Sequence, residues 1–156
     1  MDTWWIDEPR VLGSANPALG DLTSLRAEGF NVIVSLLDED EQRPYYDPAQ
    51  ARALGYARHN IPVEDFGTPT VEQLLEFVRL VRELPEDRKI VVHCYAGIGR
   101  TGTFAASYWI AKGLTVDQAL KRVRQARPEA VQTPRQRAVL DEFAVQVTQG
   151  PADRRR

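Results

Sequence analysis

The sequence predicts a single-domain α/β protein in which helices flank a central, mostly parallel sheet. Two short runs rich in β-branched residues, 31–37 and 89–93, have the length and composition of buried strands. Segments between and after them combine helical spacing of apolar residues with N-terminal capping signals. Strands that alternate with helices favour parallel pairing, because a helix carries the chain back to the start of the next strand.

The remaining strands are expected near the N-terminus and in the middle of the chain. Residues 4–6 and 10–12 are the arms of a predicted edge hairpin, and Trp4 and Trp5 are expected to lie in the core. A weaker strand pattern covers residues 56–63. His59 on this segment is expected to be an ordinary strand or surface histidine.

Two short helices are expected on either side of the strand 31–37. Residues 21–28 form the first, and Gly29 follows it in the position that a left-handed C-terminal cap favours. The second begins at Asp47 with a proline in its first turn and is closed by Gly55.

The later helices are marked by capping pairs. Thr70 and Gln73 form a capping box ahead of an apolar stripe at helical spacing (Leu74, Leu75, Val78, Val81 and Leu84). The same pattern after Thr115 and Thr133 predicts two more helices, the second ending near Gly150. We therefore expect the domain to span residues 1–150 and residues 151–156 to be a flexible tail.

Composition excludes several classes of protein. Twenty basic and 22 acidic side chains give a formal net charge of −2, whereas nucleic-acid-binding modules usually carry a clustered basic excess. One cysteine excludes an internal disulfide framework and a four-cysteine zinc site. No signal peptide and no uncharged apolar run of 18 residues is visible, so we expect a cytoplasmic protein that binds neither nucleic acid nor membrane.

One loop carries the residues suited to chemistry. It follows the strand 89–93, begins with the only cysteine, Cys94, and ends with Arg100 at the start of an apolar helix. Backbone N–H groups in such a turn, together with the N-terminus of the helix, bind a phosphate dianion and favour a thiolate. Gly97 and Gly99 permit a close approach of the backbone. Arg100 can hold two phosphate oxygens. The Thr101 hydroxyl can donate a hydrogen bond to the sulfur when the sulfur is the leaving group.

The same loop admits two other interpretations. A lone cysteine after a buried strand is often a small core residue, but the arginine and the two glycines favour a functional loop. Residues 97–102 also match the dinucleotide-binding pattern G-x-G-x-x-G. That pattern requires a second strand ending in an acidic residue about 20 positions later. Asp117 lies instead in a helical capping box, so we reject nucleotide binding.

The spacing His93-Cys94-x5-Arg100-Thr101 resembles the signature of the cysteine-based protein phosphatases of the tyrosine and dual-specificity type. The match extends over residues from about 4 to 149. The resemblance implies that Cys94 attacks phosphorus and that His93 helps to hold the loop and stabilise the thiolate. It implies that no metal and no organic cofactor is needed. It also implies that phosphate, sulfate or vanadate would bind at the site. The substrate-binding residues that it implies are Tyr95, Ala96, Gly97, Ile98, Gly99 and Arg100.

Two further segments extend the resemblance. Asp65, four positions before Pro69, matches the general acid, and its neighbour Glu64 is the competing candidate. Gln132 matches the glutamine that positions the water for hydrolysis of the phosphocysteine. Gln136 is the weaker candidate for this role, because its position in a capping box is a sufficient structural reason for a glutamine.

The resemblance implies a compact phosphomonoester hydrolase with a shallow pocket. Its expected substrates are phosphorylated proteins or peptides carrying phosphotyrosine, with phosphoserine and phosphothreonine as further substrates. The variable loop positions are not basic, and the acidic run 38–41 would repel polyanions if it lines the rim rather than forming a solvated loop. Both features favour a phosphoprotein. The alternatives are a phosphoinositide or small-molecule phosphatase and a non-catalytic adaptor that binds phosphate groups.

Overall fold

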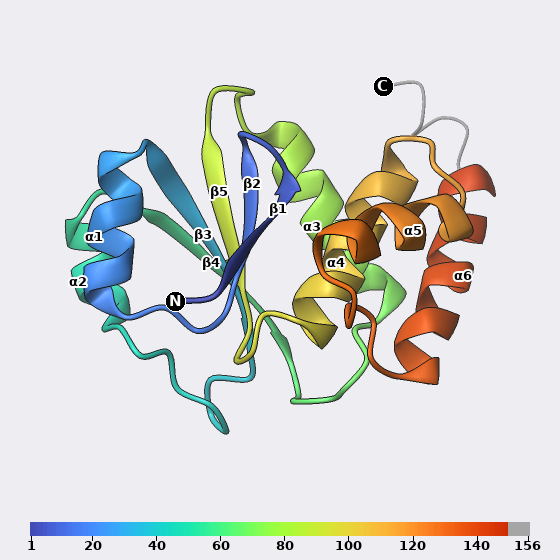
Figure 1. Cartoon of the computed structure of the whole chain (residues 1–156), viewed down its shortest axis with the longest axis horizontal. Helices are drawn as coiled ribbons and strands as arrows, with labels where there is room; N and C mark the ends of the chain where they lie inside the picture. Colours follow the sequence, from blue (N-terminus) through green and yellow to red (C-terminus); the bar gives the residue numbers. More distant parts are fainter. Residues whose placement is uncertain (150–156) are drawn as a thin grey trace.

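The computed structural model describes residues 1–149, and within them the strands form one five-stranded sheet in the order β1-β2-β5-β3-β4 (Figure 1). β1 and β2 pair antiparallel, and the other neighbours pair parallel. This arrangement confirms the predicted α/β class and the N-terminal hairpin, with β1 at the sheet edge. The strands are β1 (Thr3–Asp7), β2 (Val11–Ser14), β3 (Phe30–Leu37), β4 (Ala57–Val63) and β5 (Lys89–His93).

Helices cover both faces of the sheet (Figure 1). α1 and α2 lie on one face, and the four later helices of the described residues lie on the other. Each predicted helix is present, whereas the proposed boundary at residue 150 and the tail 151–156 lie outside the described residues. The helices are α1 (Leu19–Ala27), α2 (Pro48–Ala53), α3 (Val71–Glu83), α4 (Gly99–Ala111), α5 (Val116–Ala126) and α6 (Pro134–Gln149).

The two faces of the sheet are packed into separate apolar clusters. The larger cluster joins the sheet to α3, α4, α5 and α6, and it contains Trp4, which is buried. The smaller cluster lies under α1 and α2, and half-buried Trp5 packs against it, stacked on Phe30. Both tryptophans therefore contribute to the core, as expected, but on opposite faces. None of the helices in residues 1–149 has the length and apolar character to cross a membrane.

The strand order places three loops at one edge of the sheet. β5 lies between β2 and β3, so the loop that follows His93 leaves from the middle of the sheet and enters α4. Parallel pairing aligns Ser35 with His93 and Leu37 with Val63. The segments after β3 and β4 consequently emerge beside this loop, at the carboxyl edge where α/β sheets hold their ligands.

Candidate active site

Cys94 lies at the start of the loop between β5 and α4. The residue is buried, and its Sγ atom accepts hydrogen bonds from the Gly97 backbone N–H at 3.2 Å and from Thr101 Oγ1 at 3.0 Å. Two donors directed at the sulfur stabilise negative charge there. The structure therefore brings Cys94 and Thr101 into contact.

Gly97 is required by both conformation and space. Its φ of +77° lies in the left-handed region, and a Cβ atom there would lie 2.6 Å from the backbone nitrogen of Ala15. The Trp4 indole Nε1 donates to the Gly97 carbonyl at 2.8 Å. The loop is thus packed against β1, which carries Trp4, and against the segment after β2, which carries Ala15. The sequence placed Trp4 in the core but did not predict this contact.

Gln132 lies against the other side of the loop. A Cβ atom on Gly99 would approach Gln132 Oε1 to 2.4 Å, so the glutamine side chain occupies the space that glycine leaves open. The Gln132 backbone N–H donates to Gln136 Oε1 at 2.8 Å. Gln136 is fully buried, and its Nε2 donates to the Gly67 carbonyl at 3.0 Å. Gln136 therefore ties the segment before α6 to the loop after β4.

Arg100 is buried in the first turn of α4, and its guanidinium reaches the segments after β3 and β4. One terminal nitrogen donates to the Val63 carbonyl at 2.9 Å. The other donates to Gln42 Oε1 at 2.8 Å and to Asp65 Oδ1 at 3.1 Å. Asp65 itself is 42% exposed, so its carboxyl lies between the buried arginine and solvent.

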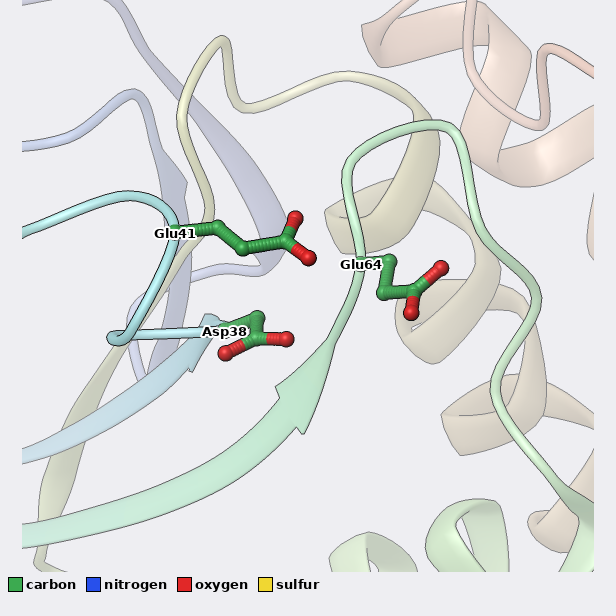
Figure 2. A group of neighbouring side chains, drawn as sticks. All are labelled: Asp38, Glu41 and Glu64. Carbon is green, nitrogen blue, oxygen red and sulfur yellow. The ribbon is translucent and has the colours of Figure 1, made fainter.

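Glu64, the competing acid, points to a different neighbourhood. Its carboxylate groups with those of Asp38 and Glu41, and the three offer oxygen atoms within 4.8 Å of one another (Figure 2). This geometry favours Asp65 over Glu64 as the partner of Arg100. It also places two members of the acidic run 38–41, Asp38 and Glu41, beside Glu64 at the rim of the site. Glu39 turns inward instead, to Ser35 and Arg58. Oxygen ligands suit hard cations, but exposed acids commonly cluster without one.

His93 is a neutral, fully buried histidine. Burial, assisted by the positive charges of Arg58 and Arg100, lowers the pKa of His93 from 6.5 to about 3. Its Nδ1 lies 3.4 Å from the Cys94 carbonyl, and its Nε2 lies 2.8 Å from the Tyr46 hydroxyl. Because a carbonyl only accepts, the proton belongs on Nδ1, and Nε2 accepts from Tyr46. His93 therefore acts on the loop through hydrogen bonds and carries no charge at neutral pH.

The buried neutral His93 predicts a loss of stability in mild acid. Between pH 6.5 and 3 the unfolded chain binds a proton that the native imidazole does not, so the free energy of unfolding falls as the pH falls. From pH 7 to pH 5 we expect this group to contribute a loss of about 2 kcal/mol. Urea unfolding at both pH values should show a smaller loss for His93→Gln. His59→Gln, which leaves the buried histidine in place, should retain the full dependence; equal losses in all three proteins would contradict the assignment.

Exposed aromatic side chains occur in the segments that form the site. Tyr95 follows Cys94 directly, and its hydroxyl accepts from that of Tyr45 at 2.7 Å, with the two rings edge to face. Phe66 follows Asp65 with a φ of +58° and is 66% exposed. Exposed rings at a site edge offer apolar contact to a bound molecule.

Sequence reasoning did not identify Gln42, Tyr45, Tyr46 or Arg58 as neighbours of the site. None of them belongs to the loop motif, and each reaches the site from another strand or loop. The one available signal was the position of residues 42–46 after a buried strand, at the sheet edge where α/β proteins hold ligands.

Comparisons with known proteins agree with this geometry. Residues 9–114 match a family model described as a polymorphic toxin system DSP-PTPase phosphatase. The crystal structure of Tk-PTP in the active form superposes with a TM-score of 0.84 at 35% identity, covering 92% of this chain and 97% of that one. The structure of PTPMT1 in complex with PI(5)P gives a TM-score of 0.84 over 94% of this chain and 96% of that one; its 24% identity shows the fold alone.

The first curated relatives are much longer than this chain. Protein tyrosine phosphatase domain-containing protein 1 of Mus musculus is 34% identical over 123 residues, which are 78% of this chain and 16% of that protein. The three first relatives of this kind are matched over 13–18% of their length.

Proposed function

Because the chain belongs to the cysteine-based protein tyrosine phosphatase superfamily, as a compact member of the dual-specificity type, we propose that it hydrolyses phosphomonoesters on proteins through a phosphocysteine intermediate. The observation that carries the proposal is the convergence of Cys94, Arg100 and Asp65 at one edge of the sheet. A nucleophile, an anion-binding guanidinium and a proton donor are the groups that this reaction requires.

In the first step Cys94 attacks phosphorus. The S–P bond forms as the P–O bond to the substrate breaks, while Arg100 and the backbone N–H groups of the loop hold the other phosphate oxygens. Asp65 gives its proton to the departing oxygen, which otherwise leaves poorly as an alkoxide or phenolate. The position of Asp65 beside Arg100 and solvent supports this role.

In the second step water hydrolyses the phosphocysteine. Gln132 orients the water and Asp65 accepts its proton, so that a P–O bond forms as the S–P bond breaks. The Thr101 hydroxyl donates a hydrogen bond to the departing sulfur and so stabilises the thiolate that forms again. The contact of Gln132 with Gly99 and the 3.0 Å distance from Thr101 Oγ1 to Cys94 Sγ support these roles.

We propose phosphotyrosine in proteins as the preferred substrate. The loop positions Tyr95, Ala96 and Ile98 are uncharged, and the nearby carboxylates of the rim repel a ligand with several phosphates. The exposed rings of Tyr95 and its partner Tyr45 offer apolar contact to an aryl group. These features together favour a single aryl phosphate on a peptide that is neutral or basic.

A matched set of substrates tests the proposal. At low salt we expect kcat/KM for a phosphotyrosine peptide with lysines beside the phosphotyrosine to exceed that of the same peptide with glutamates by about 10-fold. Neutralising the rim in the triple variant Asp38→Asn, Glu41→Gln, Glu64→Gln should reduce this ratio toward one. Faster hydrolysis of phosphoinositide vesicles than of either peptide would favour the phosphoinositide alternative. Peptide binding without phosphate release would favour an adaptor.

A further inference from the structure

We propose that Gln42 is a positioning residue that holds the general acid Asp65 in place while Arg100 binds the substrate phosphate. The inference rests on the proposed function and extends it to a residue outside the loop motif. Gln42 is half-buried in the segment between β3 and α2, and contacts both other side chains.

The three side chains form a closed ring of hydrogen bonds. Gln42 Oε1 accepts from Arg100 at 2.8 Å, and Gln42 Nε2 donates to Asp65 Oδ2 at 3.0 Å. Arg100 completes the ring by donating to Asp65 Oδ1 at 3.1 Å. The orientation of the amide follows from chemistry, since a guanidinium has no acceptor and must face the amide oxygen. Each carboxyl oxygen of Asp65 is therefore held by a different donor.

The turn that carries Gln42 is itself anchored. The Gln42 backbone N–H donates to the Asp38 carbonyl at 2.8 Å. In the same turn the Glu39 carboxylate accepts from Ser35 Oγ at 2.9 Å and pairs with buried Arg58. This turn faces the loop after β4, as the side chains of Asp38, Glu41 and Glu64 show (Figure 2). Gln42 therefore reaches Asp65 from a fixed point.

Substrate binding would change the two contacts of Asp65 unequally. Phosphate oxygens compete with Asp65 for the N–H groups of Arg100, because a guanidinium has five N–H donors in a fixed plane. The amide of Gln42 carries no charge and has no such competitor in the mechanism. It therefore remains as the donor that keeps the Asp65 carboxyl oriented toward the leaving group.

The amide also suits the charges around Asp65. Asp65 contacts the positive charge of Arg100. The acidic cluster of Asp38, Glu41 and Glu64 lies on the same two segments as Gln42 and Asp65. A glutamate at position 42 would withdraw the donor and add a carboxylate beside Asp65. Both changes favour the protonated form of Asp65.

Kinetics of Gln42→Ala and Gln42→Glu test this role against Gln50→Ala, a control at an exposed glutamine on α2. On a phosphoserine peptide, whose leaving group needs a proton, we expect Gln42→Ala to lose about 10-fold more kcat/KM than on p-nitrophenyl phosphate. In an Asp65→Asn background this selective loss should vanish. The proposed mechanism predicts that the rate falls at high pH, where Asp65 has lost its proton. Gln42→Glu should move this basic limb of the pH profile to higher pH. Equal losses on both esters, or the same selective loss without Asp65, would overturn the inference.

A measurement without turnover separates this inference from the proposed function. The side-chain amide protons of Gln42 should change their NMR chemical shifts in Asp65→Asn, because they donate to that carboxylate. If they do not respond, the inference is wrong whatever the activity. A wild-type protein that releases phosphate from neither ester contradicts the proposed function instead.

Discussion

Replacing Cys94 with serine should abolish phosphate release from p-nitrophenyl phosphate. The hydroxyl of serine is not ionised at neutral pH. Within residues 1–149 the hydrogen bonds to the Cys94 sulfur come from two donors, Gly97 and Thr101, and none comes from a base that could activate a serine. We expect a loss of about 10⁴-fold or more, as for the removal of other catalytic nucleophiles. The replacement removes little volume, so the fold and the loop should persist.

The control for this variant is ligand binding. The Trp4 indole contacts the loop through Gly97, so its fluorescence should report vanadate or phosphopeptide binding in both wild type and Cys94→Ser. Binding retained with turnover lost would support the covalent mechanism. Substantial activity in Cys94→Ser would contradict this mechanism. A folded wild type that binds phosphopeptide without turnover would instead indicate a non-catalytic adaptor.

Asp65→Asn should produce a loss that depends on the leaving group. Asparagine keeps the shape and can still contact Gln42, but it has no proton to give. On a phosphoserine peptide we expect a loss of about 10²- to 10³-fold, within the usual contribution of general acid catalysis. On p-nitrophenyl phosphate, whose phenolate leaves without help, the loss should be much smaller. The basic limb of the pH profile should disappear together with the acid.

Comparison of Glu64→Gln with Asp65→Asn shows which of the two residues is the general acid. The two carboxylates are adjacent in sequence, but Asp65 contacts Arg100 while Glu64 faces Asp38 and Glu41. Steady-state kinetics of both variants on both esters separate the two residues. If the leaving-group-dependent loss appeared in Glu64→Gln instead, the assignment of Asp65 would be wrong.

Local signals in the sequence were sufficient to predict the class of the fold. The strands 31–37 and 89–93 and the capped helices after Thr70 and Thr115 depend on residues within a few positions of each other, and the structure confirms each of them. The contact of Cys94 with Thr101 is also local in origin. Both residues belong to one strand–loop–helix unit, whose geometry follows from its own glycines and helix start.

The tertiary structure decided which distant residues meet at that loop. Gln42 and Asp65 come together only because β3 and β4 are parallel neighbours that end at the same edge, and no local pattern states which side chain will reach Arg100. The neutral state of His93 also depends on the tertiary fold, since burial in the core is the main cause of its lowered pKa. The sequence by itself therefore determined the class of fold and the loop motif, because these depend on short-range conformation. The partners and protonation states around the loop depend on packing between segments far apart in the chain.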